Sequence, residues 1–347
     1  MALDTGSSAE KREAQLQALS HFRATEFVPR RGLSGPHMQT LAGQLLRRRI
    51  HLPGSEKRLF RVEDGVEVLC HCHWLNSSRS GTTVLMVHGL EGSSESQYLI
   101  GSADKALAAG MNVVRMNVRS CGGTEHLAPT LYHSGLCSDI GAVAKALMND
   151  QDARRIVLLG FSMGGNMVLK LAGEWGSKVP GGLCAVAAVC PALDLGASAD
   201  ALHLPGNRIY ERYFVWNLKR RLKHKARLFP DRFDVHRLQG VHTLRQFDDA
   251  ITAHYFGFAN AADYYQRAAA SGLLDRIAVP TLVLHSADDP FIKILPESRT
   301  KLLDNPHVRY IETKHGGHCG FIAAPDGYDG RWAERTAVDF FQQVCGS

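Results

Sequence analysis

The sequence predicts an α/β protein with a mostly parallel sheet and helices on both of its faces. Two observations lead to this prediction. Short β-prone apolar runs alternate with helical stretches along most of the chain, and the run at 156–159 turns into a helix through a bend of small residues. Of the 347 residues, 45% are hydrophobic and 21% are charged, which provides a sizeable core in a soluble globular protein.

Seven apolar runs are expected to form strands. They lie at residues 66–71, 83–87, 112–116, 156–159, 184–189, 281–284 and 308–312. Helical stretches such as 103–109 and 140–149 separate them, as crossovers between parallel strands require. Residues 1–26 have no apolar signal core, so we expect a tail or a helix there, followed by one domain over residues 27–347.

Residues 160–164 read Gly-Phe-Ser-Met-Gly and connect an apolar run to a helical stretch. This is the G-x-S-x-G pattern of a nucleophile elbow, in which a serine occupies a sharp strand-to-helix turn. The flanking glycines let helix and strand approach closely, and the turn exposes the hydroxyl beside the free N–H groups of the helix start. The context therefore predicts Ser162 as a catalytic nucleophile.

An acid that could orient a catalytic histidine follows a late apolar run. Asp288 and Asp289 are the candidates there, and Asp289 is favoured because it lies further into the loop. Asp194 is a third candidate, but it follows an earlier strand and is better explained as a turn or cap residue.

The base is expected in the glycine-rich loop after the last run. His318 is favoured there, because the neighbouring glycines free it to reach the serine, whereas His315 is expected to end the strand. The resulting chain order of Ser162, Asp289 and His318 is that of α/β-hydrolases and of no other common serine triad.

An oxyanion hole requires backbone N–H donors near the nucleophile. We expect them at Leu90, in the segment HGLEG after the run 83–87, and at Met163, the residue after the serine. His88 is expected to hold its turn rather than to act as a base. The segment lacks the Gly-Lys-Ser ending of a phosphate-binding loop, which argues against nucleotide binding.

Six segments resemble those of the YheT-like α/β hydrolases, a family that includes bacterial YheT esterases and eukaryotic abhydrolase-domain proteins 1 and 3. They read GPHMQTL, HGLEGSSES, YHSG, GFSMGGN, ADDPF and HGGHCGF, at residues 35–41, 88–96, 132–135, 160–166, 287–291 and 315–321. The resemblance covers residues 27–341. It implies Ser162 as nucleophile, Asp289 as acid and His318 as base. The chain departs from the family at 119–123, where glycine more often follows the arginine directly.

No strand pattern occurs between residues 195 and 277, and a helical region of this length exceeds a simple crossover. α/β-Hydrolases build a cap over the pocket between strands 6 and 7, so we expect a helical cap here. Its segment 209–229 would be an amphipathic helix packed on the core, or a lid lining an acyl pocket with a basic rim that attracts anionic substrates or lipid surfaces. Tyr213, Phe214 and Trp216 cannot all face one side of such a helix.

The eight cysteines are best explained as reduced, mostly buried thiols. The Cys-His-Cys-His run at 70–73 invites a zinc interpretation, but strand periodicity places its cysteines and histidines on opposite faces. Cys319 is expected only to pack within its loop. We therefore expect no metal and no organic cofactor.

The net charge of +6 is mild, and the basic runs at 47–49 and 219–227 accompany no recognised nucleic-acid fold. We interpret them as a solvated basic face and expect no nucleic-acid partner. No stretch approaches the roughly 18 apolar residues of a membrane span, so the expected location is cytoplasmic.

Together these features predict a carboxylic-ester hydrolase that acts on short- to medium-chain acyl esters through an acyl-enzyme. An alcohol O-acyltransferase or a lipid or phospholipid acyl hydrolase would use the same triad, and a non-enzymatic binding protein is a third alternative. A serine nucleophile argues against dehalogenase and epoxide-hydrolase chemistry, for which this fold usually uses aspartate.

Overall fold

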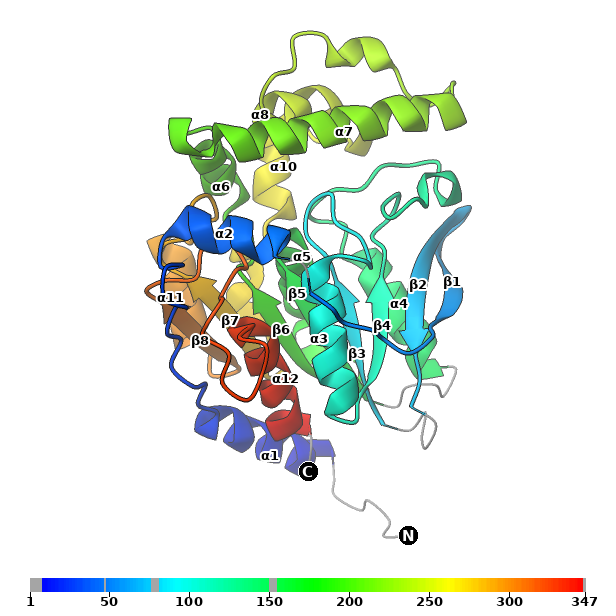
Figure 1. The fold of residues 1–347 in the computed structure, drawn as a ribbon. Coiled ribbons are helices and arrows are strands. Elements are labelled where there is room, and N and C mark those ends of the chain that lie inside the picture. Colours follow the sequence, from blue (N-terminus) through cyan, green and yellow to red (C-terminus); the bar gives the residue numbers. More distant parts are fainter. Residues whose placement is uncertain (1–7, 47, 76–80, 150–154, 346–347) are drawn as a thin grey trace.

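The computed structural model describes residues 8–46, 48–75, 81–149 and 155–345. One sheet of eight strands forms its centre, in the order β1-β2-β4-β3-β5-β6-β7-β8 (Figure 1). The strands β4, β3, β5, β6, β7 and β8 are parallel to one another, whereas β2 is antiparallel to both β1 and β4. The predicted mostly parallel sheet is therefore confirmed.

The strands are β1 (Glu56–Glu63), β2 (Val66–His73), β3 (Thr82–Val87), β4 (Asn112–Met116), β5 (Arg155–Phe161), β6 (Leu183–Val189), β7 (Thr281–Ser286) and β8 (Val308–Thr313). Every predicted run is a strand. The sequence reasoning missed β1, an edge strand in which only Phe60 is buried. The central strands β3, β6 and β7 are buried along their whole length because helices cover both faces, which explains their continuous apolar sequences.

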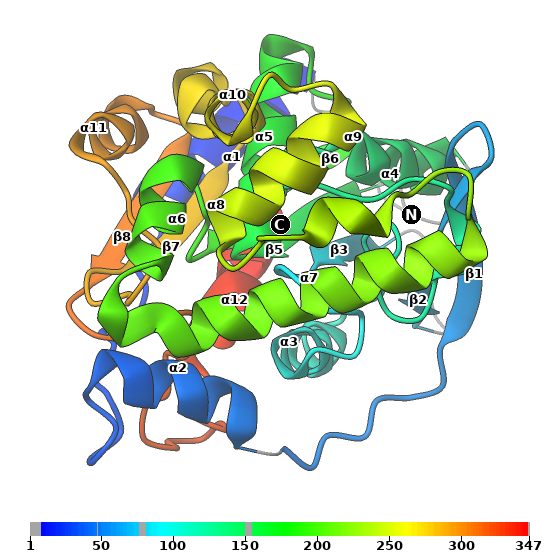
Figure 2. The same ribbon diagram turned by 90° about the horizontal axis from the view of Figure 1, so that it is seen from above.

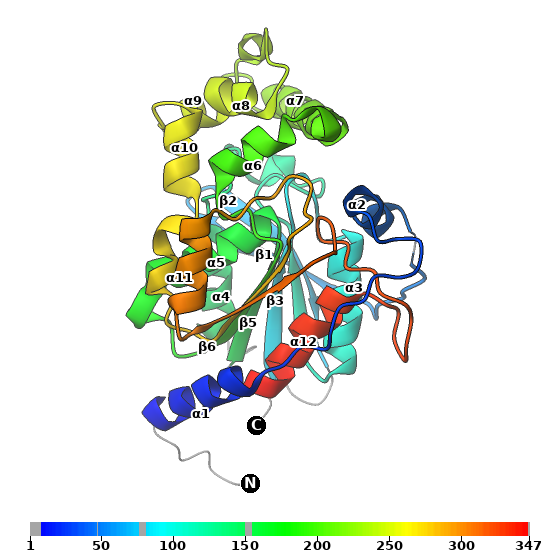
Figure 3. The same cartoon turned by 90° about the vertical axis from the view of Figure 1, so that its left-hand side faces the viewer.

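Helices cover the two faces of the sheet (Figure 3). One layer contains α4 (Ser138–Asn149), α5 (Met163–Trp175) and α11 (Pro296–Asp304), and its core includes Ile140, Met167 and Leu302. The opposite layer contains α1 (Ser8–His21), α3 (Gln97–Ala108) and α12 (Trp332–Cys345). Residues 1–7 of the expected N-terminal tail lie outside the described residues. Phe22, directly after α1, contacts Phe340 of α12, with the ring centroids 5.3 Å apart.

A helical cap lies between β6 and β7, above the carboxyl edge of the sheet (Figures 1 and 2). It consists of α6 (Leu195–Leu202), α7 (Arg208–Leu228), α8 (Leu244–Phe247), a π-helical stretch (Asp248–Ala253), α9 (His254–Phe256) and α10 (Ala261–Ala268). The helix α2 (Pro36–Leu45) lies beside α7 at the same edge. Short 3-10 helices occupy Glu125–Leu127, Gly176–Lys178, Pro205–Asn207, Val235–Leu238 and Ser271–Arg276. In the described part of the chain, no helix combines the length and the apolar character that crossing a membrane requires.

The register of the parallel strands brings several loops to one place. Val87 pairs with Gly160 and Phe161 pairs with Val189, so β3, β5 and β6 end side by side. Val189 also pairs with Leu284 in β7. The loops that follow these strands therefore meet at one edge of the sheet, under the cap, and they carry the candidate site residues.

Candidate active site

Ser162 occupies the turn between β5 and α5 with φ +54° and ψ −116°, a strained conformation for a residue with a side chain. Glycines make this turn possible. A Cβ on Gly160 would lie 2.2 Å from the Gly164 carbonyl oxygen, and one on Gly164 would lie 2.4 Å from the Val87 oxygen. The Ser162 N–H donates to the Val189 oxygen at 2.9 Å. Neighbouring strands thus fix the serine backbone, and the side chain faces the cap.

A continuous hydrogen-bond chain joins Ser162, His318 and Asp289. The distance from Ser162 Oγ to His318 Nε2 is 2.9 Å, and His318 Nδ1 lies 2.7 Å from Asp289 Oδ2. An ionised carboxylate can only accept, so Nδ1 carries the proton and Nε2 is left to accept from the serine hydroxyl. Asp289 is 1% exposed, and its Oδ1 accepts from the N–H groups of Phe291 and Ile292 at 3.1 and 2.8 Å.

The charges of this pair are mutually dependent. Burial by itself raises the pKa of Asp289, but His318 and the surrounding N–H donors more than reverse that effect and hold the pKa below its usual value. Burial lowers the pKa of His318, and the Asp289 carboxylate outweighs it, so this pKa is raised above its usual value. The arrangement therefore stabilises an imidazolium beside the serine.

The alternative acids have other partners. Asp288 accepts from the Ser286 hydroxyl and from the Gly317 N–H, the latter at 2.9 Å, and its carboxylate lies 3.4 Å from His315 Nδ1. These contacts hold the loop that carries His318. Asp194 precedes α6 and instead ties the chain before α11, where it accepts from the Leu295 N–H and the Ser298 hydroxyl at 2.8 and 2.9 Å.

The loop after β3 approaches the serine closely. A Cβ on Gly89 would lie 3.2 Å from the Ser162 Cβ, and the next residue, Leu90, borders the same cleft as Ser162 and Met163. In the described part of the chain, the N–H groups of Leu90 and Met163 have no protein acceptor. Both expected oxyanion donors are thus free beside the serine.

His88 and two tyrosines hold this loop. His88 Nε2 accepts from the Val118 N–H at 3.0 Å, so Nδ1 is protonated and donates to the Gly89 oxygen at 2.7 Å. Burial lowers the pKa of His88 to about 4, which keeps it neutral and structural, as the sequence suggested. The Tyr98 hydroxyl accepts from the Gly89 N–H at 2.9 Å, and the Tyr132 hydroxyl accepts from the Glu91 N–H at 3.2 Å.

A buried ion pair links the same loop to the cap, and sequence reasoning missed it. Glu91, at φ +57°, receives two hydrogen bonds from Arg221 of α7, at 2.8 and 3.0 Å, and one from the Tyr132 hydroxyl at 2.7 Å. Arg221 also donates to Glu125 at 3.0 Å and to the Ser120 oxygen. The cap helix is therefore fastened directly beside Leu90.

This linkage corrects one interpretation of the basic runs. Residues 219–227 were expected to form a solvated face, yet Arg221 is mostly buried and Lys225 is fully buried. The Lys225 ammonium donates to the Glu125 oxygen at 2.9 Å and to the Ala128 oxygen, and burial lowers its pKa to about 8. These two cations face the protein because carbonyl and carboxylate oxygens satisfy them there. In the other basic run, Arg47 lies outside the described residues. Arg48 is also mostly buried, because its guanidinium donates to the Glu334 carboxylate at 2.6 and 2.7 Å, so the expected solvated face is wrong there too.

A cleft with a cavity volume of about 110 Å³ lies between the serine and the cap. Its lining is mostly apolar and comes from both the sheet edge and the cap, including Leu90, Leu195, Leu202, Phe214, Leu218 and Phe291. Along α7, Phe214 faces this cleft while Tyr213 and Trp216 are 59% and 58% exposed. The expectation that these three aromatic residues cannot share one face is confirmed.

Comparison with known proteins agrees with this architecture. A family model described as the alpha/beta hydrolase fold matches residues 82–325. The chain is 32% identical to YheT of Escherichia coli strain K12, a provisionally named esterase, over 91% of this chain and 93% of YheT. The chain belongs to the YheT-like α/β hydrolases.

Two relatives of lower identity are lipid hydrolases. The human monoacylglycerol lipase ABHD2 is 27% identical over 90% of this chain and 78% of its own length. The human phospholipase ABHD3 is 28% identical over 76% of this chain and 64% of its own length. As a member of this family of esterases and lipases, the protein is a carboxylic-ester hydrolase of the α/β-hydrolase fold.

Solved structures share the fold at low identity. The 2,6-dihydroxy-pseudo-oxynicotine hydrolase aligns with a TM-score of 0.58 at 20% identity and covers 90% of this chain and 73% of its own. The Pyrococcus furiosus esterase Pf2001 aligns with a TM-score of 0.55 at 16% identity, over 93% and 98% of the two chains. Both likenesses concern the fold alone.

Proposed function

We propose that the protein hydrolyses short- to medium-chain carboxylic esters through an acyl-enzyme on Ser162, with His318 as base and Asp289 as the acid that orients it. The observation that supports this most strongly is the hydrogen-bond chain of 2.9 and 2.7 Å that runs from the serine hydroxyl to a buried carboxylate. The apolar cleft above Ser162 supports an acyl substrate, because burial of methylene groups there is favourable.

In the first half of the reaction, His318 Nε2 takes the proton of Ser162 Oγ as the oxygen attacks the ester carbonyl. The carbonyl π electrons move to its oxygen, which accepts hydrogen bonds from the N–H groups of Leu90 and Met163. Loss of one such donor typically costs about 100- to 1,000-fold in turnover. Asp289 remains ionised and stabilises the imidazolium that forms.

In the second half, the tetrahedral intermediate collapses and the bond to the leaving alcohol breaks. His318 gives its proton to that alcohol, and the acyl group remains esterified to Ser162. A water molecule then attacks the acyl carbonyl, with His318 again accepting the proton, and the acid is released as the serine recovers its hydrogen.

Acyl transfer to an alcohol is the second candidate, since an alcohol that replaces this water would use the same triad. Its support is the apolar lining of the cleft, which would admit an alcohol with a hydrocarbon chain. Hydrolysis of p-nitrophenyl esters of rising chain length, with and without ethanol, separates the two reactions. We expect free acid as the main product and a preference for short to medium chains. Ethyl ester as the main product at low ethanol would favour the transferase.

The mouth of the cleft supports contact with a lipid surface. Leu45 of α2 and Ile209 of α7 are 72% and 70% exposed there, and Tyr213 lies beside them. On the same helix the guanidinium of Arg220 lies 4.8 Å from the ring centroid of Trp216. Apolar side chains with adjacent cations are typical of peripheral lipid binding. We expect sedimentation with anionic vesicles and weaker sedimentation of Tyr213→Ser; equal binding of both proteins would contradict this role.

The decisive test of the proposed chemistry is the turnover of p-nitrophenyl butyrate by Ser162→Ala. The elbow tolerates a small side chain, so this variant should keep its circular-dichroism spectrum and lose ester turnover. Asp194→Asn, which alters a carboxylate outside the hydrogen-bond chain, is the matched control. Turnover of Ser162→Ala close to wild type would rule out the assigned nucleophile.

A further inference from the structure

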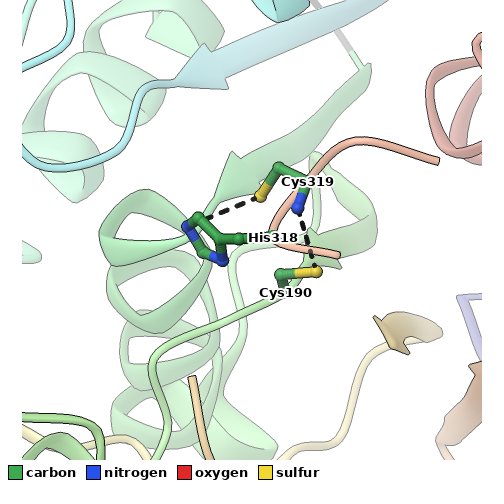
Figure 4. A group of neighbouring side chains, drawn as sticks. All are labelled: Cys190, His318 and Cys319. Atoms are coloured by element: carbon green, nitrogen blue, oxygen red, sulfur yellow. Dashed lines mark hydrogen bonds between the residues drawn. The ribbon is translucent and has the colours of Figure 1, made fainter. Parts of the chain in front are cut away.

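Two cysteines flank His318, and the proposed ester chemistry uses neither of them (Figure 4). Cys190 directly follows β6, and Cys319 directly follows the histidine. Cys319 Sγ lies 3.9 Å from His318 Nε2, and the Cys319 N–H donates to Cys190 Sγ at 3.4 Å. One ligand atom from each of the three residues lies within 4.8 Å of the other two. Two sulfurs and one imidazole nitrogen thus form a compact cluster.

The backbone holds both sulfurs in place at a conformational cost. Cys190 has φ +43° and Cys319 has φ +56°, in the left-handed region where glycine is favoured. The Cys190 N–H donates to the Leu284 oxygen at 2.7 Å, which fixes that residue against β7. Cys190 is fully buried, whereas Cys319 is half-buried and borders the open part of the cleft together with His318. A small ion in the cleft would therefore reach the cluster from the side of Cys319.

The cluster has the chemistry of a zinc ligand set. Two thiolates and one neutral imidazole are common ligands of Zn²⁺, with Zn–S and Zn–N bonds of about 2.3 and 2.0 Å. Those bonds imply ligand atoms roughly 3.5–3.8 Å apart in a tetrahedral site. The distance of 3.9 Å from Cys319 Sγ to His318 Nε2 is about 0.4 Å longer than the ideal sulfur–nitrogen separation. The two sulfurs and one ring nitrogen of His318 lie within 4.8 Å of one another, so closing the site requires an inward shift of up to about 1.3 Å.

We propose that Cys190, His318 and Cys319 form an inhibitory site for a thiophilic divalent cation, with Zn²⁺ as the ion that fits the ligand set. On binding, each thiol loses its proton to solvent, and the ion takes the lone pair of His318 Nε2. That nitrogen then no longer accepts the proton of Ser162. Binding itself is independent of the proposed ester hydrolysis; only the inhibition rests on it.

The first experiment is a Zn²⁺ titration of p-nitrophenyl butyrate turnover, with each variant normalised to its own zinc-free rate. We expect inhibition of the wild type that EDTA reverses. Cys319→Ser and Cys190→Ser should require at least about tenfold more zinc, since loss of a single partner of a metal site commonly costs that much affinity. Cys184→Ser is the matched control, because it removes a buried cysteine from the opposite end of β6; it should behave as wild type.

The second experiment measures binding without turnover, by titration of the intact protein with Co²⁺. We expect the visible bands of tetrahedral cobalt and a thiolate charge-transfer band in wild type and in Cys184→Ser, and their loss in Cys319→Ser. If wild type lacks these bands, or Cys319→Ser keeps both them and its zinc sensitivity, the site is refuted. If the cobalt bands depend on Cys319 but the wild-type protein shows no ester turnover, the metal site is supported and the proposed function is refuted.

Discussion

Replacement of Arg221 by methionine should separate the cap from the loop that carries Leu90. Methionine keeps the apolar stem of the side chain but removes every hydrogen bond of the guanidinium. Glu91 would lose its two bonds of 2.8 and 3.0 Å and keep only the one from Tyr132. Because Glu91 is only 5% exposed, water would not readily replace the lost donors.

The size of the effect follows from this burial. Removal of one partner from a buried ion pair typically costs about 3–5 kcal/mol, because the remaining charge is left uncompensated. We therefore expect the free energy of unfolding to fall by roughly that amount. Leu90 adjoins Glu91, so release of the loop should also weaken one oxyanion donor and lower kcat by up to about 100- to 1,000-fold, with a smaller change in KM.

Urea unfolding and steady-state kinetics on p-nitrophenyl butyrate would measure both effects. Lys223→Met is the matched control, because it removes an exposed cation from the same helix and should change neither quantity. Glu91→Gln and the double variant complete a cycle, in which we expect strong coupling between the two positions. An Arg221→Met protein with reduced stability but wild-type kcat would show that the pair only fastens the cap, and additive effects would refute the pairing itself.

Three further predictions concern the site. Asp289→Asn should lower turnover by about 10⁴-fold, because an amide stabilises the wrong tautomer of His318, whereas Asp288→Asn should have a much smaller effect; a comparable loss in both would contradict the assignment. Because the pKa of His318 is raised, the neutral imidazole that can act as a base becomes populated only at pH values above the ordinary histidine pKa of about 6.5. We therefore expect kcat/KM, measured with EDTA present, to rise with pH above that value. Full activity at pH 5 would exclude His318 as the base. Phe214→Ala should change the preference between butyrate and longer esters, since Phe214 borders the cleft, while Trp216→Ala should leave it unchanged, because Trp216 is exposed and does not line the cleft; equal profiles would mean that α7 does not select the acyl chain.

Much of the fold could be predicted from local sequence patterns. Strands buried on both faces read as continuous apolar runs, and the elbow around Ser162 is recognisable because close approach of strand and helix excludes every residue but glycine at two positions. The edge strand β1 was missed for the opposite reason: one buried residue among eight leaves no clear period.

Contacts between distant parts of the chain were beyond this reasoning. Arg221 reads as one cation in a basic helix, and only the folded chain brings it to Glu91, 130 positions earlier. Cys319 was expected to fill space in its loop, because nothing local indicates that Cys190, the residue directly after β6, lies beside it. The position of Asp289 in its loop was enough to favour it over Asp194. The hydrogen-bond partners of Asp194 across the sheet edge could not be predicted from the sequence.

The most direct test of the proposed mechanism is the site at which a fluorophosphonate attaches. Wild-type protein should gain one adduct by intact mass, and peptide mapping should place it on Ser162. Ser162→Ala should gain none while its circular-dichroism spectrum stays unchanged, and His318→Gln should react far more slowly. An adduct on another residue would contradict the mechanism. So would ester turnover that persists in the folded protein after Ser162 has been labelled.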